Sequence, residues 1–267
     1  MKRLAINGGG FMGGAMAEGL LDSGWTRDNI LVAEVRPDRC RVLVEDLKLE
    51  VTPDAAGAVR QAETALFAVK PQDIPEVLRL VAPAFRRDQL AISIAAGVPI
   101  ASFERALGDV PVIRTMPNTP AAIGYGMTAM ARGKFATDAH TVIAINILGS
   151  VGKTILVDES QMDAVTAVSG TGPAYLFLLA EALIEAAMRE GLSTEHAHAL
   201  TYQTFVGASN LLLHEPAGPA ELRRRVTSPQ GTTHAAVTHL TQQRWTDIFV
   251  EAVHAARVRS EELGRMR

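Results

Sequence analysis

The sequence is poor in cysteine. Cys40 is the single cysteine among 267 residues, so neither an internal disulfide nor a cluster of thiolates around a metal can form. Such a chain is typical of a reducing compartment, and we expect a cytoplasmic protein. The seven histidines are poorly spaced for a metal site, because His196 and His198 diverge on a helix and His234 and His239 are five residues apart. We therefore expect no metal.

Long apolar runs, aromatic residues and an excess of charge are also lacking. Aromatic residues make up 5% of the chain and charged residues 21%, and the formal net charge is −3. Such a charge gives no reason to expect a nucleic-acid partner. No run approaches the roughly 20 apolar residues that span a bilayer, so we expect no membrane association. Hydrophobic residues still make up 48%, enough for a core in one large domain or two smaller ones.

The first part of the chain alternates short apolar runs with helical segments. Runs that are apolar throughout are typical of strands buried on both faces, and their alternation with helices favours a parallel sheet. We therefore predict an α/β fold with a Rossmann-like, doubly wound sheet over residues 1–160. The predicted strands are 4–6, 30–33, 65–69, 90–94, 110–113, 127–131 and 154–157, and helices are expected over 12–21 and 74–81.

The second part, residues 161–267, has no such alternation and is predicted to be all-helical. Helices are expected over 173–190 and 194–214, and again from about 233 and about 246. The stretch 175–183 is apolar almost all round, so it must be buried on several sides. Burial in a homodimer would achieve this, and the centre of a monomeric bundle is the alternative. We favour a dimerisation domain.

Three glycines follow the first predicted strand. Gly8, Gly10 and Gly13 match G-x-G-x-x-G between a strand and a helix. A tight turn needs a residue that tolerates positive φ, and a pyrophosphate approaches the backbone only where no Cβ stands in the way. The following helix offers free N–H groups and the positive end of its dipole. We predict that a dinucleotide is bound by Gly8, Gly9, Gly10, Phe11 and Met12.

An acidic residue follows the second predicted strand. Glu34 lies 21 residues after Gly13, where a carboxylate usually accepts hydrogen bonds from the adenine ribose. Taken alone, Glu34 favours NAD. Arg36 could instead meet the 2′-phosphate of NADP, or could simply be solvated at the start of a helix. The residues leave both cofactors open, and Glu34 and Arg36 are candidate ligands in either case.

Three later strands also end in unusual residues. Ligands of open α/β sheets bind beyond the carboxyl ends of the strands. Small residues there let a flat nicotinamide approach the backbone, and two prolines would hold the amide of Asn118. Lys70 could equally be solvated, and Asn118 could cap its own backbone. We predict cofactor contacts from Ala68, Val69, Lys70, Pro71, Ala95, Ala96, Gly97 and Asn118.

Two loops of the helical half each open a helix. They read S-G-T-G-P over 169–173 and T-S-P-Q-G-T-T over 227–233. Hydroxyls and glycines at a helix N-terminus predict an anion site suited to a carboxylate, and plain helix capping is the alternative.

Six motifs in order resemble those of the pyrroline-5-carboxylate reductase family, over nearly the whole chain. They are the glycine turn with Met12, A-V-K-P-Q-D at 68–73, S-I-A-A-G-V at 93–98, R-T-M-P-N-T-P-A at 114–121, D-A-V-T-A-V-S-G-T-G-P-A-Y at 163–175 and L-R-R-R-V-T-S-P-Q-G-T-T at 222–233. The resemblance implies hydride transfer from NADPH or NADH to the C=N bond of 1-pyrroline-5-carboxylate, which gives L-proline. It also implies a helical homodimer, which in the family often assembles further into a ring of dimers.

The same resemblance assigns the substrate residues. Thr233 would donate or relay a proton at the ring nitrogen, and backbone N–H groups would bind the substrate carboxylate. The substrate would be held by Val226, Gly231, Thr232, Thr233 and Gly172.

Four positions depart from the family pattern. Phe11 and Ala55 replace asparagines, Glu34 replaces a small polar residue, and Gln230 replaces a glycine or alanine. There are three alternatives to this activity, and one is a catalytically silent cofactor-binding protein, against which the retained Thr232 and Thr233 argue. Gln230 leaves open a reductase of a related cyclic imine carboxylate. A β-hydroxyacid dehydrogenase-like enzyme would need a lysine in the second domain, whereas the last lysine of this chain is Lys153.

Overall fold

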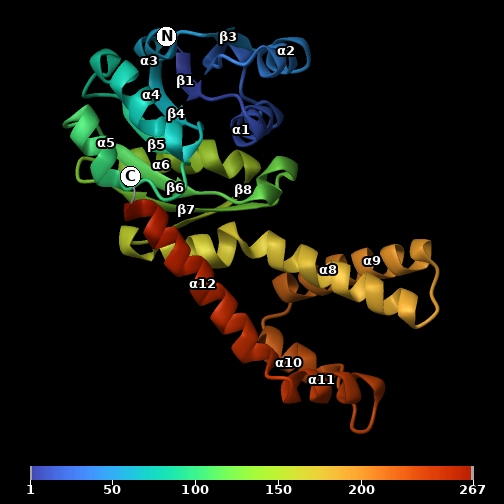
Figure 1. Cartoon of the computed structure of the whole chain (residues 1–267). Helices are drawn as coiled ribbons and strands as arrows, with labels where there is room; N and C mark the ends of the chain where they lie inside the picture. Colours follow the sequence, from blue (N-terminus) through green and yellow to red (C-terminus); the bar gives the residue numbers. More distant parts are fainter. Residues whose placement is uncertain (1, 266–267) are drawn as a thin grey trace. The chain divides into compact units, whose positions relative to one another are not determined.

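The computed structural model describes residues 2–265 and divides into two compact units (Figure 1). Unit 1 comprises the chain up to Thr171 together with the residues from Ala256 onward, and unit 2 comprises Gly172–Ala255. This division does not coincide with the predicted one between residues 160 and 161. Met162 and Val165 follow residue 160 and pack into the core beneath the sheet, so the segment that carries them stays with unit 1.

Unit 1 is built around an eight-stranded sheet with the order β3-β2-β1-β4-β5-β6-β7-β8. Strands β1 to β6 are mutually parallel, as expected for a doubly wound sheet. The strands are β1 Lys2–Asn7, β2 Ile30–Ala33, β3 Glu50–Thr52, β4 Ala62–Phe67, β5 Leu90–Ser93, β6 Val112–Met116, β7 Gly126–Arg132 and β8 Gly152–Leu156.

Helices cover both faces of this sheet (Figure 1). Successive side chains of a strand point to opposite faces, so Leu4 and Ile6 pack with Met16 and Ile147 while Ala5 packs with Ala58 on the other side. The side chains on both faces of the strand are therefore buried, which explains why the strand is apolar at successive positions. The helices are α1 Phe11–Asp22, α2 Pro37–Glu45 and α6 Asp138–Leu148 on one face, and α3 Ala55–Gln61, α4 Ile74–Val81 and α5 Ile100–Leu107 on the other.

Two strands differ from the sequence prediction. The three-residue edge strand β3 was not predicted, because E-V-T carries no apolar run and is only half-buried. Strand β7 runs antiparallel to β6. The short segment 117–125 joins them, whereas a parallel connection requires a crossover of a dozen or more residues.

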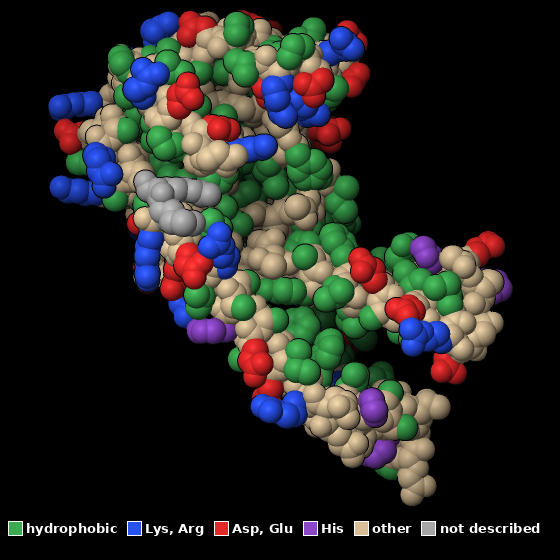
Figure 2. Space-filling view, viewed as in Figure 1, with side chains coloured by type: hydrophobic (Ala, Val, Ile, Leu, Met, Phe, Trp, Pro, Cys, Tyr) green, Lys and Arg blue, Asp and Glu red, His purple; other side chains and the backbone are tan. Residues whose placement is uncertain are grey.

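Unit 2 is helical, as the composition of the second half predicted. Its helices are α8 Gly172–Arg189, α9 Thr194–His214, α10 Gly218–Arg225, α11 Thr232–Gln242 and the part of α12 (Trp245–Arg265) up to Ala255. Helix α8 contains no buried residue, and its apolar side chains are exposed in the single chain; Leu178, for example, is 66% exposed. Figure 2 shows hydrophobic side chains gathered along this helix. Unit 2 thus leaves an apolar surface uncovered.

One continuous helical stretch, Glu159–Arg189, is long and apolar enough to cross a bilayer. This stretch is not an uninterrupted apolar run in the sequence, because serine, threonine and glycine residues interrupt it. A single stretch of this kind is a weak sign of a membrane span, and the same composition suits a helix that packs against other protein on several sides.

Candidate functional site

The glycine turn connects β1 to α1 at the carboxyl edge of the sheet. Gly8 has φ +102°, a conformation that favours glycine, and its N–H donates to Ala33 O at 2.8 Å. A Cβ on Gly8 would lie 2.9 Å from the carbonyl atoms of Ala68. A Cβ on Gly13 would overlap the carbonyl oxygen of Gly8. The turn therefore has its shape only because these positions are glycine.

The same turn leaves the N-terminus of α1 open. Gly10 is the N-cap residue and provides no side-chain cap, and the first intrahelical bond joins Gly14 N to Gly10 O. The N–H groups of Phe11, Met12 and Gly13 precede that bond and point out of the helix start. A glycine cradle with open N–H groups at the positive end of a helix fits a dinucleotide pyrophosphate. The Phe11 side chain is 64% exposed.

Glu34 lies just beyond the end of β2, and its carboxylate is tied back to the glycine turn. Its Oε2 accepts from Gly9 N at 2.9 Å, and its Oε1 accepts from the N–H groups of Val35 and Arg36, also at 2.9 Å. The Arg36 guanidinium forms an ion pair with Oε2 at 3.3 Å and is about half exposed, whereas Glu34 is buried. The two predicted ligands of the adenine ribose thus contact each other.

These donors control the ionisation of Glu34. Burial alone would raise the pKa of this carboxyl. The N–H and guanidinium of Arg36, followed by the N–H groups of Val35 and Gly9, outweigh burial and hold the pKa below its ordinary value. Glu34 is therefore a carboxylate at neutral pH, fixed beside the glycine turn.

A second arginine holds the turn from the other side. Arg39 on α2 donates through Nε to Gly9 O at 2.9 Å and through Nη2 to Gly10 O at 3.4 Å. Arg39 is not among the site residues predicted from the sequence. Its spacing of one helical turn from Arg36 was the available signal.

The other predicted cofactor segments end neighbouring strands. Ala68 follows β4 and donates from its N–H to Asn7 O at 2.8 Å, and Ala95 follows β5. Strands β1, β4 and β5 are adjacent in the sheet, so the structure brings the glycine turn and both segments to one edge. Gly97 has φ +72°, and the side chain of Lys70 is exposed. The segments are Ala68-Val69-Lys70-Pro71 and Ala95-Ala96-Gly97.

The side chain of Asn118 is committed to the protein itself. Its Nδ2 donates to Ser169 O at 3.2 Å, and its Oδ1 accepts from Met127 N at 2.9 Å. Ser169 lies in the π-helical turn Thr166–Gly170. Asn118 therefore ties the end of β6 to β7 and to this turn, and the predicted cofactor contact stays a prediction.

Four of the five predicted substrate residues, Val226, Gly231, Thr232 and Thr233, lie in unit 2 at or shortly before the start of α11. Gly231 is the N-cap, no side chain caps the helix, and the first bond joins Ala235 N to Gly231 O. Gln230 has φ +61°, which is unusual for a residue with a Cβ. Thr233 is half-buried, whereas Val226 is 63% exposed. Gly172 begins α8 in the same unit.

Sequence reasoning missed one buried polar group. Asn7 ends β1 directly before the glycine turn and is 1% exposed, and within the described part of the chain neither its Oδ1 nor its Nδ2 has a hydrogen-bond partner. Buried polar atoms are nearly always paired, so this amide is an exception. A polar residue at the end of an apolar strand was the signal in the sequence.

Comparison with known proteins decides the family. A curated pyrroline-5-carboxylate reductase from Pseudomonas aeruginosa is 40% identical over 263 residues, covering 98% of this chain and 96% of the relative. One from Synechocystis is 39% identical over 98% of each chain. This chain belongs to the pyrroline-5-carboxylate reductase family. Residues 159–263 match the model of pyrroline-5-carboxylate reductase dimerisation, and residues 3–97 match NADP oxidoreductase coenzyme F420-dependent.

Solved structures of pyrroline-5-carboxylate reductases support this assignment. The enzyme from Coxiella burnetii superposes with a TM-score of 0.92 at 33% identity over 98% of both chains. The pyrroline carboxylate reductase from Plasmodium falciparum, solved with NADP bound, gives a TM-score of 0.87 at 27% identity over 98% of both chains. The predicted two-part fold, a Rossmann-like sheet followed by a helical dimerisation domain, is confirmed, and the chain is an oxidoreductase of this family.

Proposed function

We propose that this reductase converts 1-pyrroline-5-carboxylate into L-proline. In this reaction the imine carbon gains a hydride, the C–H bond at C4 of the nicotinamide breaks, and the ring nitrogen gains a proton. The nicotinamide is oxidised and the imine is reduced. The strongest support for the proposal is the 40% identity to a pyrroline-5-carboxylate reductase over 98% of the chain. The glycine turn, whose shape fits a dinucleotide, agrees with it.

The residues of unit 1 would hold the cofactor that supplies the hydride. The open N–H groups at the start of α1 suit the pyrophosphate, and Gly8, Gly9 and Gly10 leave room for it. Small residues in the Ala95-Ala96-Gly97 segment let a nicotinamide ring lie close to the backbone. The segment Ala68–Pro71 lies at the same edge of the sheet, beside the glycine turn.

We propose that NADH is preferred to NADPH. Four donors hold the Glu34 carboxylate at the ribose position, where it would accept from the 2′-hydroxyl of NADH. A 2′-phosphate would meet this negative charge at close range. The guanidinium of Arg36, which would otherwise attract the phosphate, is already engaged in an ion pair with Glu34, and three backbone N–H groups hold the carboxylate in its charged form. The Plasmodium falciparum relative was solved with NADP bound. The proposed preference of this chain for NADH is therefore argued from Glu34 and Arg36 and not from that relative.

The start of α11 would hold the substrate. The N–H groups of the first turn, including those of Thr232 and Thr233, have no side-chain cap and suit the imine carboxylate. The Thr233 hydroxyl would donate or relay the proton that the ring nitrogen gains. An imine is readily protonated, so one positioned hydroxyl provides sufficient acid assistance. Val226, Gly231 and Gly172 complete the proposed set.

One assay tests the reaction. The loss of nicotinamide absorbance would be followed with NADH and NADPH in parallel, with 1-pyrroline-5-carboxylate and its six-membered homologue as substrates. We expect turnover of the five-membered imine, with a higher kcat/KM for NADH. Turnover of neither imine would refute the reductase proposal, and faster turnover of the larger ring would favour the related cyclic imine reductase.

We further propose that the protein works in the cytoplasm as a homodimer, which could assemble into a ring of dimers. The match to the dimerisation model and the exposed apolar face of α8 support the dimer. Light scattering on the purified protein measures the subunit number. Leu178→Glu should release monomers, because an unpaired charge cannot be buried in an apolar interface. A monomeric parent protein would contradict this proposal.

A further inference from the structure

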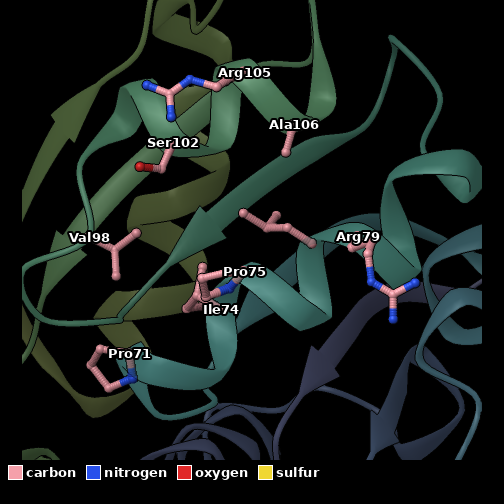
Figure 3. Close-up of a pocket in the computed structure, with 9 residues that line it drawn as sticks. Pro71, Ile74, Pro75, Arg79, Val98, Ser102, Arg105 and Ala106 are labelled. Carbon is pink, nitrogen blue, oxygen red and sulfur yellow. The ribbon is translucent and has the colours of Figure 1, made fainter. Parts of the chain in front are cut away.

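A cleft of about 270 Å³ opens between α4 and α5 in unit 1 (Figure 3). Its floor is apolar, and Ile74, Leu78 and Val98 are almost fully buried beneath it. Small-molecule sites are typically concave and apolar with a few polar groups that orient the ligand. This volume suits a ligand of only a few carbon atoms.

Three polar side chains border the cleft without a partner. The guanidinium groups of Arg79 and Arg105 and the hydroxyl of Ser102 make no hydrogen bond or ion pair among residues 2–265. Figure 3 shows Arg105 and Ser102 on α5 close to each other, and Arg79 on α4 at another side of the cleft. A guanidinium beside a hydroxyl donates several hydrogen bonds and carries positive charge, so this corner is complementary to a carboxylate.

The cleft also touches the predicted cofactor segments. Pro71 lines it and is the last residue of Ala68-Val69-Lys70-Pro71. Val98 lines it as well and directly follows Gly97. A ligand in the cleft would therefore contact Pro71, the last residue of one segment, and Val98, the residue directly after the other.

We propose that this cleft binds a small aliphatic monocarboxylate. The carboxylate would pair with Arg105 and Ser102, and the aliphatic body would cover Pro71, Pro75 and Ala106, the lining residues whose apolar surface is still accessible. Through Pro71 and Val98, the bound ligand would change the affinity of the neighbouring segments for the nicotinamide cofactor. The binding step is independent of the proposed reaction, whereas the effect on the cofactor rests on the cofactor site proposed above.

Calorimetry on the cofactor-free protein tests the binding step. Sodium hexanoate is the probe, and hexanol, which has the same body without the charge, is the comparison. For so small a ligand we expect a Kd on the order of 1 mM. The double variant Ser102→Ala/Arg105→Gln should weaken hexanoate binding at least about fivefold, since it removes the charge-assisted hydrogen bonds. The control Arg87→Gln removes the same charge from an 85% exposed side chain outside the cleft and should bind hexanoate like the parent.

The effect on the cofactor is measured without turnover, by the fluorescence of bound NADH with and without saturating hexanoate. We expect the Kd for NADH to change at least about twofold in the parent and in Arg87→Gln, and not in the double variant. No binding of hexanoate, equal binding of hexanol, or undiminished binding in the double variant would each overturn the carboxylate site. Binding with an unchanged NADH affinity would overturn the coupling. Because neither measurement uses the imine, a failed reductase assay leaves both results interpretable.

Discussion

Two helix starts in this protein have the same local design and very different surroundings. Helices α1 and α11 both begin after a glycine N-cap and lack a side-chain cap, whereas Asp54 caps α3 and Ser193 caps α9. Helices α2, α4, α5 and α10 also start without a side-chain cap, so what sets α1 and α11 apart is the N-cap glycine, which leaves room for a ligand beside the free N–H groups. The start of α1 is packed into the sheet domain, and the start of α11 lies in a unit with little buried surface of its own.

The difference teaches how each site is held in shape. The turn before α1 is fixed by close packing, by the carboxylate of Glu34 and by the guanidinium of Arg39. Among residues 2–265, the hydrogen bonds of the loop before α11 are local, such as the one from Gly231 N to Ser228 O at 3.0 Å. We infer that the cofactor turn is preorganised in the single chain and that the substrate loop depends on the assembled enzyme for its rigidity.

The largest expected effect concerns the packing of the cofactor turn. Gly13→Ala would place a Cβ against the Gly8 carbonyl oxygen and force the turn open. We expect NADH affinity to fall on the order of a hundredfold, through loss of the pyrophosphate geometry. Fluorescence titration of NADH measures it. Gly207→Ala is the matched control, because a Cβ there meets nothing within 4 Å. Unchanged affinity in Gly13→Ala would remove the turn from the cofactor site.

The next effect concerns the loop before α11. Thr233→Ala should lower kcat by about ten- to a thousandfold, because one positioned hydrogen bond to the reacting nitrogen is lost. Thr233→Ser keeps the hydroxyl and should recover most of the rate. Thr238→Ala, an exposed threonine on the same helix, serves as the control. A parent-like rate in Thr233→Ala would show that the proton comes from elsewhere.

Residue pattern predicted the first of these helix starts better than the second. A buried strand, a G-x-G-x-x-G turn and a helix leave few alternatives, so β1, the turn and α1 followed from local sequence. The role of the Gly231–Thr233 loop came only from the family resemblance, because hydroxyls at a helix start are equally typical of capping. The contact between Glu34 and Gly9 and the burial of Asn7 depend on how distant strands pair, and no local pattern encodes them.

A smaller effect tests the electrostatics of the cofactor turn. Glu34→Ser should shift the ratio of kcat/KM values toward NADPH by about tenfold, since removing one close negative charge relieves the repulsion of a 2′-phosphate. The assay compares both cofactors at one ionic strength. Arg41→Ser changes an exposed charge on α2 and is the control for nonspecific charge effects. An unchanged ratio would show that the ribose binds away from Glu34.

The contribution of the Glu34 carboxylate to the stability of the protein should depend on pH. The folded state lowers the pKa of Glu34, so its stabilisation is present above the unfolded pKa of about 4.3 and is lost as pH falls through the folded value. The unfolding free energy of the parent should therefore exceed that of Glu34→Gln at pH 7, and the gap should narrow below about pH 4. Urea unfolding at several pH values measures it. A gap that is constant with pH would mean that Glu34 contributes through packing alone.

The smallest expected effect is the change in protein stability when Asn7, which lies beneath the cofactor turn, is replaced. Both polar atoms of the Asn7 amide are buried without partners beneath this turn, which costs about 1–3 kcal/mol in comparable cases. Asn7→Leu has a similar branched shape and no polar atoms, so we expect stability to rise by about 1 kcal/mol and Tm by about 2–4 °C. Thermal unfolding measures the change. A fall in Tm would show that the amide is hydrogen-bonded in solution, to a buried water for example, and that the turn depends on it. A rise in Tm would show that the preorganised turn contains a buried polar group that destabilises it. The loop before α11 is exposed, so its polar groups can bond to water and no such cost arises there.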